Sequence, residues 1–199
     1  MKAPINICWF RRDLRLKDHA ALYHALKAGL PVLPVFIFDS NILDLLENKA
    51  DRRVQFIHDA IAEMQVVLEE MGSTMQVMYG RPEAVFNQLL EQYNINTVFV
   101  NHDYEHYDKE QDNKIYTLLK EKNVGMQHFK DQVIFEKDEV IKDDGSPYTV
   151  FTPYSKKWKA KLKDFYFSFG ERIHERAAIN TQLTETDLMN SEVHQRNGQ

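Results

Sequence analysis

Five short apolar runs alternate with amphipathic segments along the first 130 residues of this chain. The segments between the runs place apolar residues three or four positions apart, the spacing of one face of a helix. A helix that joins two such strands returns the chain to the same edge of a sheet, so neighbouring strands run parallel. The sequence therefore predicts an α/β fold, a doubly wound five-stranded parallel sheet that is Rossmann-like. The expected strands cover residues 5–10, 32–38, 74–79, 97–100 and 126–129.

Local signals place the ends of the intervening helices. Asp18 and Asp51 are positioned to cap the helices that follow them, and Pro82 takes the first helical position, which tolerates proline. Gly72 and Gly125 are expected to end the helices before them. The predicted helices cover residues 20–27, the long stretch from 51 to 72, residues 82–93 and residues 108–121. The long helix should turn one apolar face to the core, with Val54, Ile57, Ile61, Met64, Leu68 and Met71.

Beyond the alternating region the pattern changes. The segment from Asp131 to Asp144 has the composition of a loop or of very short strands, and residues 156–163 contain five lysines around Trp158. Residues 178–199 are polar and have no clear apolar periodicity. We therefore expect a domain over residues 1–131 followed by a C-terminal linker extension over residues 132–199.

Four charged residues follow the first apolar run directly. They are Arg11, Arg12, Asp13 and Arg15. Open α/β sheets bind their ligands outside the carboxyl ends of the strands, which is where this connection should lie. The alternative is a solvated cluster of ion pairs, which are common on protein surfaces and individually weak. The sequence leaves both interpretations open.

A ligand crevice is the best candidate site. In a parallel sheet whose strand order reverses beside the first strand, the loops after the first, second and fourth strands converge. These loops carry residues 11–13, 38–40 and 101–105. Apolar and aromatic walls with a few fixed polar groups suit a planar heteroaromatic molecule. The alternative is that Phe38 belongs to the core and Asp39 is a turn residue at the strand end.

Several kinds of catalytic site lack their sequence motif. The seven glycines are spread so that neither G-x-G-x-x-G nor G-x-x-x-x-G-K occurs. His102 and His106 lie four residues apart, but a metal site at that spacing needs a helix and this segment follows a strand directly. No serine or cysteine stands in a recognisable nucleophile elbow. We therefore predict no catalytic residue and no metal site in this chain.

The net charge, the cysteine content and the lack of long apolar runs indicate the cellular location of the protein and the classes of partner that it can bind. A net charge of −5 and a pI near 5.9 argue against a general nucleic-acid-binding chain, although a local basic patch is compatible with them. The single cysteine, Cys8, lies inside an apolar run, so no intramolecular disulfide is possible. No run of 18 apolar residues and no secretory signal pattern occur, so no membrane partner is expected. These features favour a cytoplasmic protein.

Two motifs resemble a known family. Residues 9–16, Trp-Phe-Arg-Arg-Asp-Leu-Arg-Leu, followed by Asp18 and Leu22, are similar to the opening signature of the DNA photolyase and cryptochrome family. Residues 145–154, Gly-Ser-Pro-Tyr-Thr-Val-Phe-Thr-Pro-Tyr, followed by Trp158, resemble the segment just beyond that family's N-terminal domain. The resemblance covers the chain from Ile5 to at least Trp158.

The resemblance implies a fragment of a longer protein. Family members have an N-terminal α/β domain that binds a light-harvesting antenna chromophore, a linker, and a C-terminal helical domain that binds FAD and UV-damaged DNA. This chain resembles the first two parts, so the FAD-binding helical domain is expected to be absent and the fragment alone non-catalytic. The full-length parent is expected to be a deoxyribodipyrimidine photolyase, a carbon-carbon lyase of DNA repair. In it the antenna would excite FAD, and FAD would donate an electron to a pyrimidine dimer.

The resemblance also assigns residues by motif position. The antenna in this family can be a deazaflavin, a flavin or a folate. Folate-binding relatives often have a histidine before the second helix and an Asn-Glu pair after the fourth strand, where this chain has Glu47, Tyr107 and Asp108, which slightly favours a deazaflavin or a flavin. The antenna-binding candidates are Ile37, Phe38, Asp39, Arg53, Glu105, Tyr107 and Asp108. The interdomain and structural motif residues are Arg11, Arg12, Asp13, Arg15, Phe151, Thr152, Pro153 and Trp158.

Other functions remain open at this point. The lysines and aromatic residues from Tyr154 to Phe169 could form a stacking platform for single-stranded nucleic acid. We favour contact with the chain's own C-terminal helical domain, in which case the exposed fragment should self-associate. The parent could instead be a cryptochrome, a photoreceptor without repair activity. A more distant alternative is a stand-alone nucleotide-binding regulatory module, which the missing phosphate loop argues against.

Overall fold

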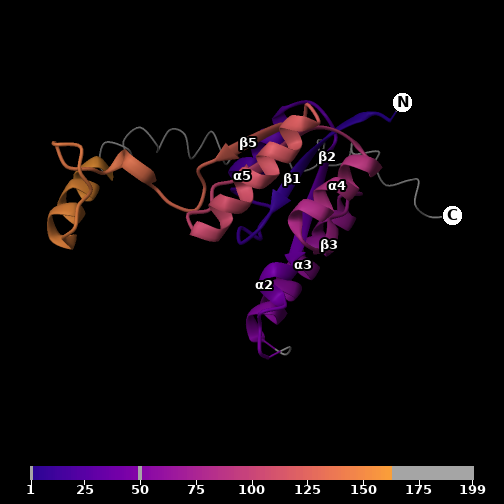
Figure 1. Ribbon diagram of the computed structural model, residues 1–199, viewed down its shortest axis with the longest axis horizontal. Helices are drawn as coiled ribbons and strands as arrows, with labels where there is room; N and C mark the ends of the chain where they lie inside the picture. The colour runs from indigo at the N-terminus through magenta and orange to yellow at the C-terminus, as the bar shows by residue number, and fades with distance from the viewer. Residues whose placement is uncertain (1, 49–50, 163–199) are drawn as a thin grey trace.

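One five-stranded sheet forms the centre of the fold, with all strands parallel and in the order β3-β2-β1-β4-β5 (Figure 1). The computed structural model describes residues 2–48 and 51–162. The strand order reverses beside β1, so the predicted doubly wound, Rossmann-like α/β class is confirmed. The strands are β1 (Pro4–Phe10), β2 (Val32–Asp39), β3 (Gln76–Gly80), β4 (Asn94–Asn101) and β5 (Gly125–Phe129).

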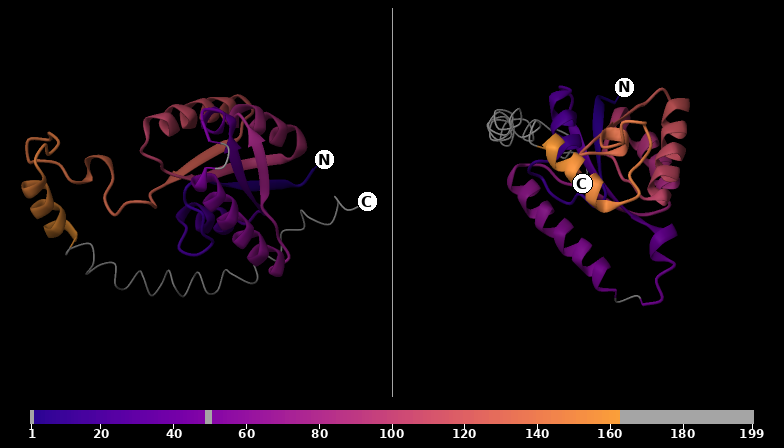
Figure 2. Two further views of the ribbon diagram at one scale, coloured as in Figure 1. Left: turned by 90° about the horizontal axis from the view of Figure 1, so that it is seen from below. Right: turned by 90° about the vertical axis from the view of Figure 1, so that its left-hand side faces the viewer.

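Helices cover both faces of the sheet. Helices α1 (Ala20–Lys27) and α3 (Arg52–Glu70) pack on one face, and α4 (Pro82–Gln92) and α5 (His106–Glu121) pack on the other. Figure 2 shows α3 and α5 on opposite sides of the strands. Successive residues of β1 therefore enter different cores: Trp9 packs with α4 and α5, whereas Phe10 packs with α1 and α3. Burial on both faces explains why this strand is apolar apart from the buried Asn6.

The cap of α1 differs from the sequence-based expectation. Asp18, the predicted cap, has a φ of 51°, and His19 occupies the N-cap position instead. The His19 Nδ1 atom accepts a hydrogen bond from the backbone N–H of Leu22 at 3.1 Å. The prediction was wrong because an aspartate is a common cap by residue type, whereas here a buried histidine, held by other partners, supplies the acceptor.

Helix α3 begins and ends as predicted. Asp51 Oδ1 accepts from the backbone N–H of Arg53 at 2.8 Å. At the other end Gly72 has a φ of 74°, and Ser73 donates its N–H to the Leu68 carbonyl at 2.8 Å, which is the Schellman arrangement. Ile61, Met64 and Leu68 are buried. The first turns of α3 project beyond the sheet together with the short helix α2 (Ser40–Leu43), which the sequence analysis did not predict (Figure 1).

Gly125 does not end helix α5. Asn123 has a φ of 58°, and Val124 donates its N–H to the Leu119 carbonyl at 2.9 Å, so Asn123 takes the position that glycine usually occupies. Gly125 is instead the first residue of β5. A Cβ atom at this position would lie 2.9 Å from Thr97 Oγ1 on β4, so the glycine is required by close approach of two strands.

Beyond β5 the chain leaves the sheet. Residues 130–150 form an irregular connection with one short 3-10 turn, η1 (Lys137–Glu139), and residues 151–162 are helical. This helical segment extends away from the sheet (Figure 1) and packs against the connection, with the Trp158 ring 5.7 Å from that of Phe135. The aromatic run 165–169 and the polar residues 178–199 lie outside the described residues. Within residues 2–48 and 51–162, no helix is long and apolar enough to cross a membrane.

Candidate functional site

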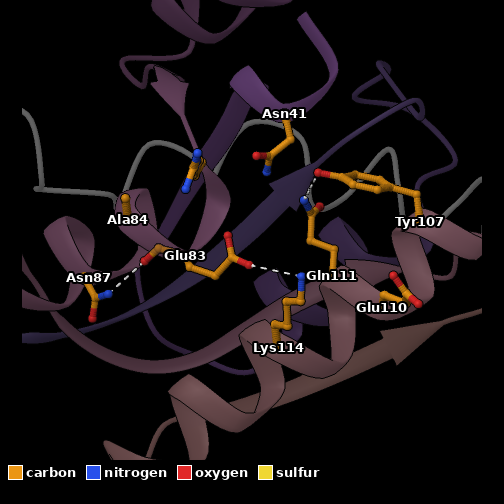
Figure 3. A pocket seen from close by; sticks show the side chains of 9 residues that line it. Asn41, Glu83, Ala84, Asn87, Tyr107, Glu110, Gln111 and Lys114 are labelled. Carbon is orange, nitrogen blue, oxygen red and sulfur yellow. Dashed lines mark hydrogen bonds and ion pairs between the residues drawn. The ribbon is translucent and has the colours of Figure 1, made fainter. Parts of the chain in front are cut away.

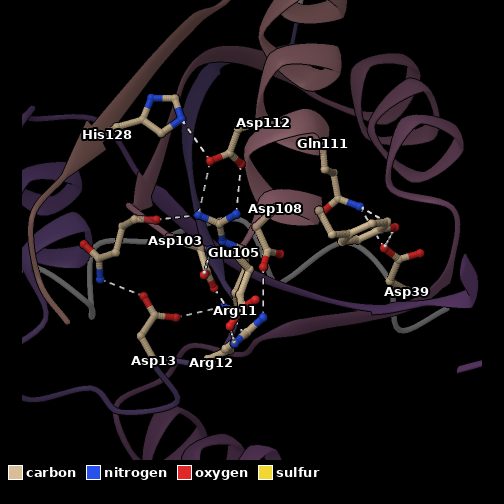
Figure 4. Close-up of polar contacts among 12 residues, drawn as sticks. Arg11, Arg12, Asp13, Asp39, Asp103, Glu105, Asp108, Gln111, Asp112 and His128 are labelled. Carbon is tan, nitrogen blue, oxygen red and sulfur yellow. Dashed lines mark hydrogen bonds and ion pairs between the residues drawn. The ribbon is translucent and has the colours of Figure 1, made fainter. Parts of the chain in front are cut away.

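The connections after β1, β2 and β4 meet at the carboxyl edge of the sheet, as the strand order predicts (Figure 4). Side chains from the first turns of α5 complete the cluster. Two arginines and five carboxylates gather here, so the edge carries an excess of negative charge. These are Arg11, Arg12, Asp39, Asp103, Glu105, Asp108 and Asp112.

The Asp13 side chain, in the connection after β1, is hydrogen-bonded to the end of β4 and to the start of α1. Its Oδ1 atom accepts from the backbone N–H of Arg11 at 2.8 Å, and its Oδ2 atom accepts from Asn101 Nδ2 at 2.7 Å and from His19 Nε2 at 2.9 Å. Burial raises the pKa of Asp13, but the His19, Arg11 and Asn101 hydrogen bonds outweigh it and hold the pKa at about 2. Asn101 Oδ1 also accepts from the N–H of Ala21 at 2.9 Å. The carboxylate therefore fixes β1, β4 and α1 relative to one another.

Arg11 and Arg12 have different environments although they are neighbours in the sequence. The Arg11 guanidinium is largely buried; it pairs with Asp112 at 2.9 Å, donates to the Asn101 carbonyl and lies 5.1 Å from the centre of the Trp9 ring. Arg12 is more exposed and faces three carboxylates. Its distances are 3.2 Å to Asp103, 3.5 Å to Glu105 and 2.9 Å to Asp108.

One of the carboxylates around Arg12 lacks, within the described part of the chain, a hydrogen-bond partner for one of its oxygen atoms. Asp103 Oδ2 lies within ion-pair distance of Arg12 but has no hydrogen-bond partner among the described residues. Burial, together with the charge of Asp103, raises the pKa of Asp108 above its usual value. A ligand that donates hydrogen bonds is therefore better suited to this edge than one that brings further negative charge.

A cavity of about 260 Å³, which we term the inner cavity, opens beside these charges. Its walls come mainly from the ends of β1 and β2, from α2 and from the start of α4. Most of its lining is apolar, and five polar side chains interrupt it. The apolar residues are Trp9, Phe36, Ile37, Phe38, Ile42, Leu43, Ile57 and Pro82, and the polar ones are Arg11, Arg12, Asp39, Asp108 and Gln111.

Asp39, Tyr107 and Gln111 form a hydrogen-bonded group at one side of the inner cavity. Asp39 Oδ2 accepts from Tyr107 Oη at 2.5 Å and from Gln111 Nε2 at 2.7 Å. Partial burial and the bond to Asp39 raise the pKa of Tyr107 to about 12. The Oδ1 atom of Asp39 accepts from the N–H of Asn41 at 2.8 Å and caps α2. Asp39 is thus both a residue at a strand end and part of the cavity wall.

A second cavity of about 590 Å³, the outer cavity, lies between α4 and the first turns of α5 (Figure 3). Its lining is polar. It consists of Asn41, Arg81, Glu83, Ala84, Asn87, Tyr107, Glu110, Gln111 and Lys114. Sequence reasoning missed Gln111 and Asp112, although their spacing of three and four residues from Asp108 places them on the same face of a helix.

Some predicted site residues lie elsewhere. Arg53 does not line either cavity; its side chain is 78% exposed and pairs with Asp51 at 2.6 Å. Glu105 lines neither cavity; its carboxylate lies 3.5 Å from Arg12 and its backbone N–H donates to Asp103 at 3.2 Å. Arg15 pairs with Asp131 at the start of the connection that follows β5. Phe151, Thr152 and Pro153 are exposed on the helical segment that leaves the sheet, and Trp158 packs on Phe135.

The two histidines of the predicted β4 end do not form a pair. His102 Nδ1 lies 2.9 Å from Glu136 Oε2, whereas His106 is exposed and lies near Glu110 on α5. Within the part of the chain that the structure describes, no group of three or more histidine, cysteine, aspartate or glutamate residues is arranged to hold a metal ion.

The family model and the similar proteins that follow all belong to one family of proteins. The model of the DNA photolyase family matches residues 6–177. A deoxyribodipyrimidine photo-lyase of Synechococcus is 31% identical over 163 residues, which are 82% of this chain and 33% of that protein. A blue-light photoreceptor of Arabidopsis thaliana is 30% identical over 152 residues, 73% of this chain and 34% of that protein. The chain thus spans about a third of the length of these relatives.

A solved structure shares the fold. The crystal structure of an archaeal photolyase from Sulfolobus tokodaii superposes with a TM-score of 0.59 at 28% identity, over 67% of this chain and 32% of that one. That structure is described as containing two FAD molecules, with the implication of a novel light-harvesting cofactor.

Proposed function

Since the chain belongs to the DNA photolyase family, we propose that it is the N-terminal domain of a deoxyribodipyrimidine photolyase and that this domain holds a light-harvesting antenna chromophore. The domain comprises residues 1–131, and residues 132–199 form the linker. The inner cavity carries this proposal, because it combines an apolar, aromatic lining with a few convergent polar groups at the switch point of the sheet.

The residues of the inner cavity suit a planar heteroaromatic ring. Trp9, Phe36 and Phe38 supply flat apolar surface, and Ile37, on the opposite face of β2 from the two phenylalanines, adds an aliphatic side chain. The Asp39 carboxylate and the Gln111 amide are placed at the rim, where they can pair with ring N–H and carbonyl groups. The excess of carboxylates disfavours a folate, whose glutamate tail is anionic, and supports a deazaflavin or a flavin.

A bound antenna would absorb light and pass the excitation to FAD in the C-terminal helical domain. The activity on UV-damaged DNA would then belong to the full-length protein only. The exposed Val150 and Phe151 support the proposal that the linker contacts that helical domain, and they also support self-association of this chain when it is isolated. The cytoplasmic location expected from the sequence stays a prediction.

Spectroscopic titration of the purified 199-residue chain with a deazaflavin, a flavin and a folate tests the antenna proposal. We expect quenched fluorescence and a shifted absorption band for the deazaflavin or the flavin. Gln111→Ala should weaken binding several-fold, because the amide lines the inner cavity. Asn113→Ala removes an exposed amide from the same helix and should leave the affinity unchanged. Arg53→Ala tests whether Arg53, which was assigned to the antenna site by motif position alone, contributes to chromophore binding.

Two results would contradict the proposal. One is a folded chain, shown by circular dichroism, that binds none of the three chromophores. The other is binding that Gln111→Ala and Asn113→Ala affect equally, because the ligand would then lie outside the inner cavity.

A second candidate function is that of a cryptochrome, a photoreceptor without repair activity. The 30% identity to a blue-light photoreceptor supports it. Repair of cyclobutane dimers by the full-length protein that carries this domain would decide for the photolyase, and light-dependent signalling without repair would decide for the cryptochrome.

A further inference from the structure

Strand β3 is an edge of the sheet, and its exposed side chains are apolar. It pairs with β2 only, so one side of its backbone has no partner strand within the described residues. Val77 is 43% exposed and Tyr79 is 63% exposed. Val77 is in register with Phe36, so both exposed side chains lie on the face of the sheet that carries α1 and α3. The free edge therefore offers unpaired backbone groups beside two apolar side chains.

The two edges of the sheet differ in this respect. Strand β5 also pairs with one strand only, but its exposed positions are Gly125 and Gln127. Soluble proteins commonly protect a free edge with a lysine, a proline or a bulge. Strand β3 has none of these, because its sequence is Gln-Val-Met-Tyr-Gly and its pairing with β2 is regular from Gln76 to Gly80. This edge is therefore suited to pairing with a further strand.

The residue pattern of β3 is complementary to a second copy of itself. If two β3 strands pair antiparallel about a two-fold axis at Met78, each Val77 lies opposite the partner's Tyr79 and on the same face. An aromatic and a β-branched residue in opposite positions stabilise an antiparallel pair of strands. The same surface serves both copies, so this arrangement closes as a dimer and does not continue into a fibre.

The charges at the two ends of β3 are also complementary. Arg81 directly follows the strand. Glu69 is held near its start by a shared partner, since Gln65 Nε2 donates to Glu69 Oε1 at 2.7 Å and also to Thr74 Oγ1. Arg81 and Glu69 are exposed, and neither forms an ion pair within the described residues. Antiparallel pairing would place the end of one strand beside the start of the other, and thus Arg81 beside the partner's Glu69.

We propose that two copies of this chain associate through β3, with the two strands antiparallel and the two sheets joined into one. The net charge of −5 makes the copies repel each other, so the pairs of Arg81 with the partner's Glu69 are needed to select this contact. One short strand from each copy makes a small interface, for which we expect a dissociation constant of about 100 µM. The proposal does not depend on the antenna chromophore, and its surface is separate from the linker residues Val150 and Phe151.

Sedimentation equilibrium of the 199-residue chain tests the proposal. The mass should rise with concentration from the 23.5 kDa of one chain toward twice that value. Tyr79→Lys should weaken the dimer about tenfold, because a lysine replaces the aromatic member of both cross-strand pairs. Tyr116→Lys makes the same change at an exposed position on α5 and should leave the dissociation constant unchanged. Circular dichroism of each variant confirms that it is folded.

Charge reversal tests the antiparallel direction. Arg81→Glu and Glu69→Arg each place like charges at both ends of the paired strands, so each variant alone should stay monomeric. In an equimolar mixture, both contacts between the two variants join a carboxylate to a guanidinium. The mixture should therefore form heterodimers with about the affinity of the wild type, measured by sedimentation with one variant fluorescently labelled.

Several results would overturn the proposal. They are a monomer at every concentration, equal effects of Tyr79→Lys and Tyr116→Lys, and a mixture of the two charge-reversal variants that stays monomeric. A dimer that is lost in Phe151→Ser and kept in Tyr79→Lys would also overturn it, because association would then occur through the linker. None of these results bears on chromophore binding, so the antenna proposal is tested separately.

Discussion

His19 Nε2 donates a hydrogen bond of 2.9 Å to the Oδ2 atom of Asp13, and both side chains are buried. The other ring nitrogen, Nδ1, accepts from the backbone N–H of Leu22 and caps α1. Because Nδ1 acts as an acceptor, these hydrogen bonds assign the ring proton to Nε2. The aspartate of the Arg-Arg-Asp segment therefore determines how α1 begins, and its charge is part of the fold.

The charge of Asp13 should make the stability of the domain depend on acid pH. The pKa of Asp13 in the folded chain is about 2, below its ordinary value of 3.8. A lowered pKa in the folded state gives a stabilisation that is complete above the unfolded pKa and is lost as the pH falls toward 2. The loss should be about 2 kcal/mol. Urea unfolding between pH 6 and pH 2 measures it.

The variant Asp13→Asn provides the comparison. It should be less stable than the wild type by about 2 kcal/mol at pH 6, because a donor replaces an acceptor beside Asn101 and His19, and the difference should shrink toward pH 2. Asp138→Asn, at an exposed position, should follow the wild-type curve. A constant difference between Asp13→Asn and the wild type over this range would contradict the assignment.

Arg11→Ala should lower the free energy of unfolding by about 3 kcal/mol, because it removes the Arg11 donors from the Asn101 carbonyl and from the Asp112 carboxylate, which keeps the longer His128 contact at 3.5 Å. The Arg11 and Asp112 side chains are only 10% and 12% exposed, so water replaces the lost bonds poorly. Urea unfolding of Arg53→Ala is the matched control, with an expected loss below about 1 kcal/mol for an exposed pair. Equal losses in the two variants would show that Arg11 is only a surface ion pair.

The sequence predicted those parts of the fold that local chemistry decides. The central strands β1, β2 and β4 were found because their apolar runs are buried on both faces. The limits of α3 were found because Asp51 and Gly72 act on adjacent backbone groups. The cap of α1 was missed because His19 is positioned by Asp13. Gly125 was wrongly predicted to end α5, because what requires a glycine there is the close approach of Thr97, which lies on another strand.

The candidate site was predicted to a similar extent. The strand order brought Arg12, Asp39 and Asp108 to one edge, as expected for a switch point. The hydrogen-bonded group of Asp39, Tyr107 and Gln111 was not foreseen, because Asp39 ends β2 whereas the other two residues lie on α5, so they meet only in the folded chain. Arg53 was assigned by motif position, and in the structure its pairing with Asp51 holds it at the helix start.

Gly125→Ala should destabilise the domain by about 1–3 kcal/mol, because the new Cβ atom would lie 2.9 Å from Thr97 Oγ1 and the strands would have to separate. A double-mutant cycle with Thr97→Ala, measured by urea unfolding, tests this cause. The double variant should be more stable than the sum of the two single losses predicts. Additive losses would show that the cost arises from the backbone and not from the contact.

Glu136→Gln should loosen the linker without unfolding the domain. Glu136 Oε2 accepts from Tyr104 Oη at 2.6 Å and lies 2.9 Å from His102 Nδ1, so one carboxylate oxygen joins the connection to the end of β4. Partial burial raises the pKa of Glu136, but the Tyr104 and His102 contacts outweigh it and hold the pKa below its usual value, so this oxygen is charged at neutral pH. Hydrogen bonds to a charged group contribute about 1.5–3 kcal/mol.

The expected result is hydrogen exchange about tenfold faster in residues 132–142 at pH 7, with an unchanged urea midpoint for the domain. Glu121→Gln, at the exposed end of α5, should change neither quantity. Unchanged exchange in Glu136→Gln would mean that the Lys130 pair with Glu139, at 2.7 Å, holds the connection by itself. In that case Lys130→Ala, and not Glu136→Gln, should produce the faster exchange.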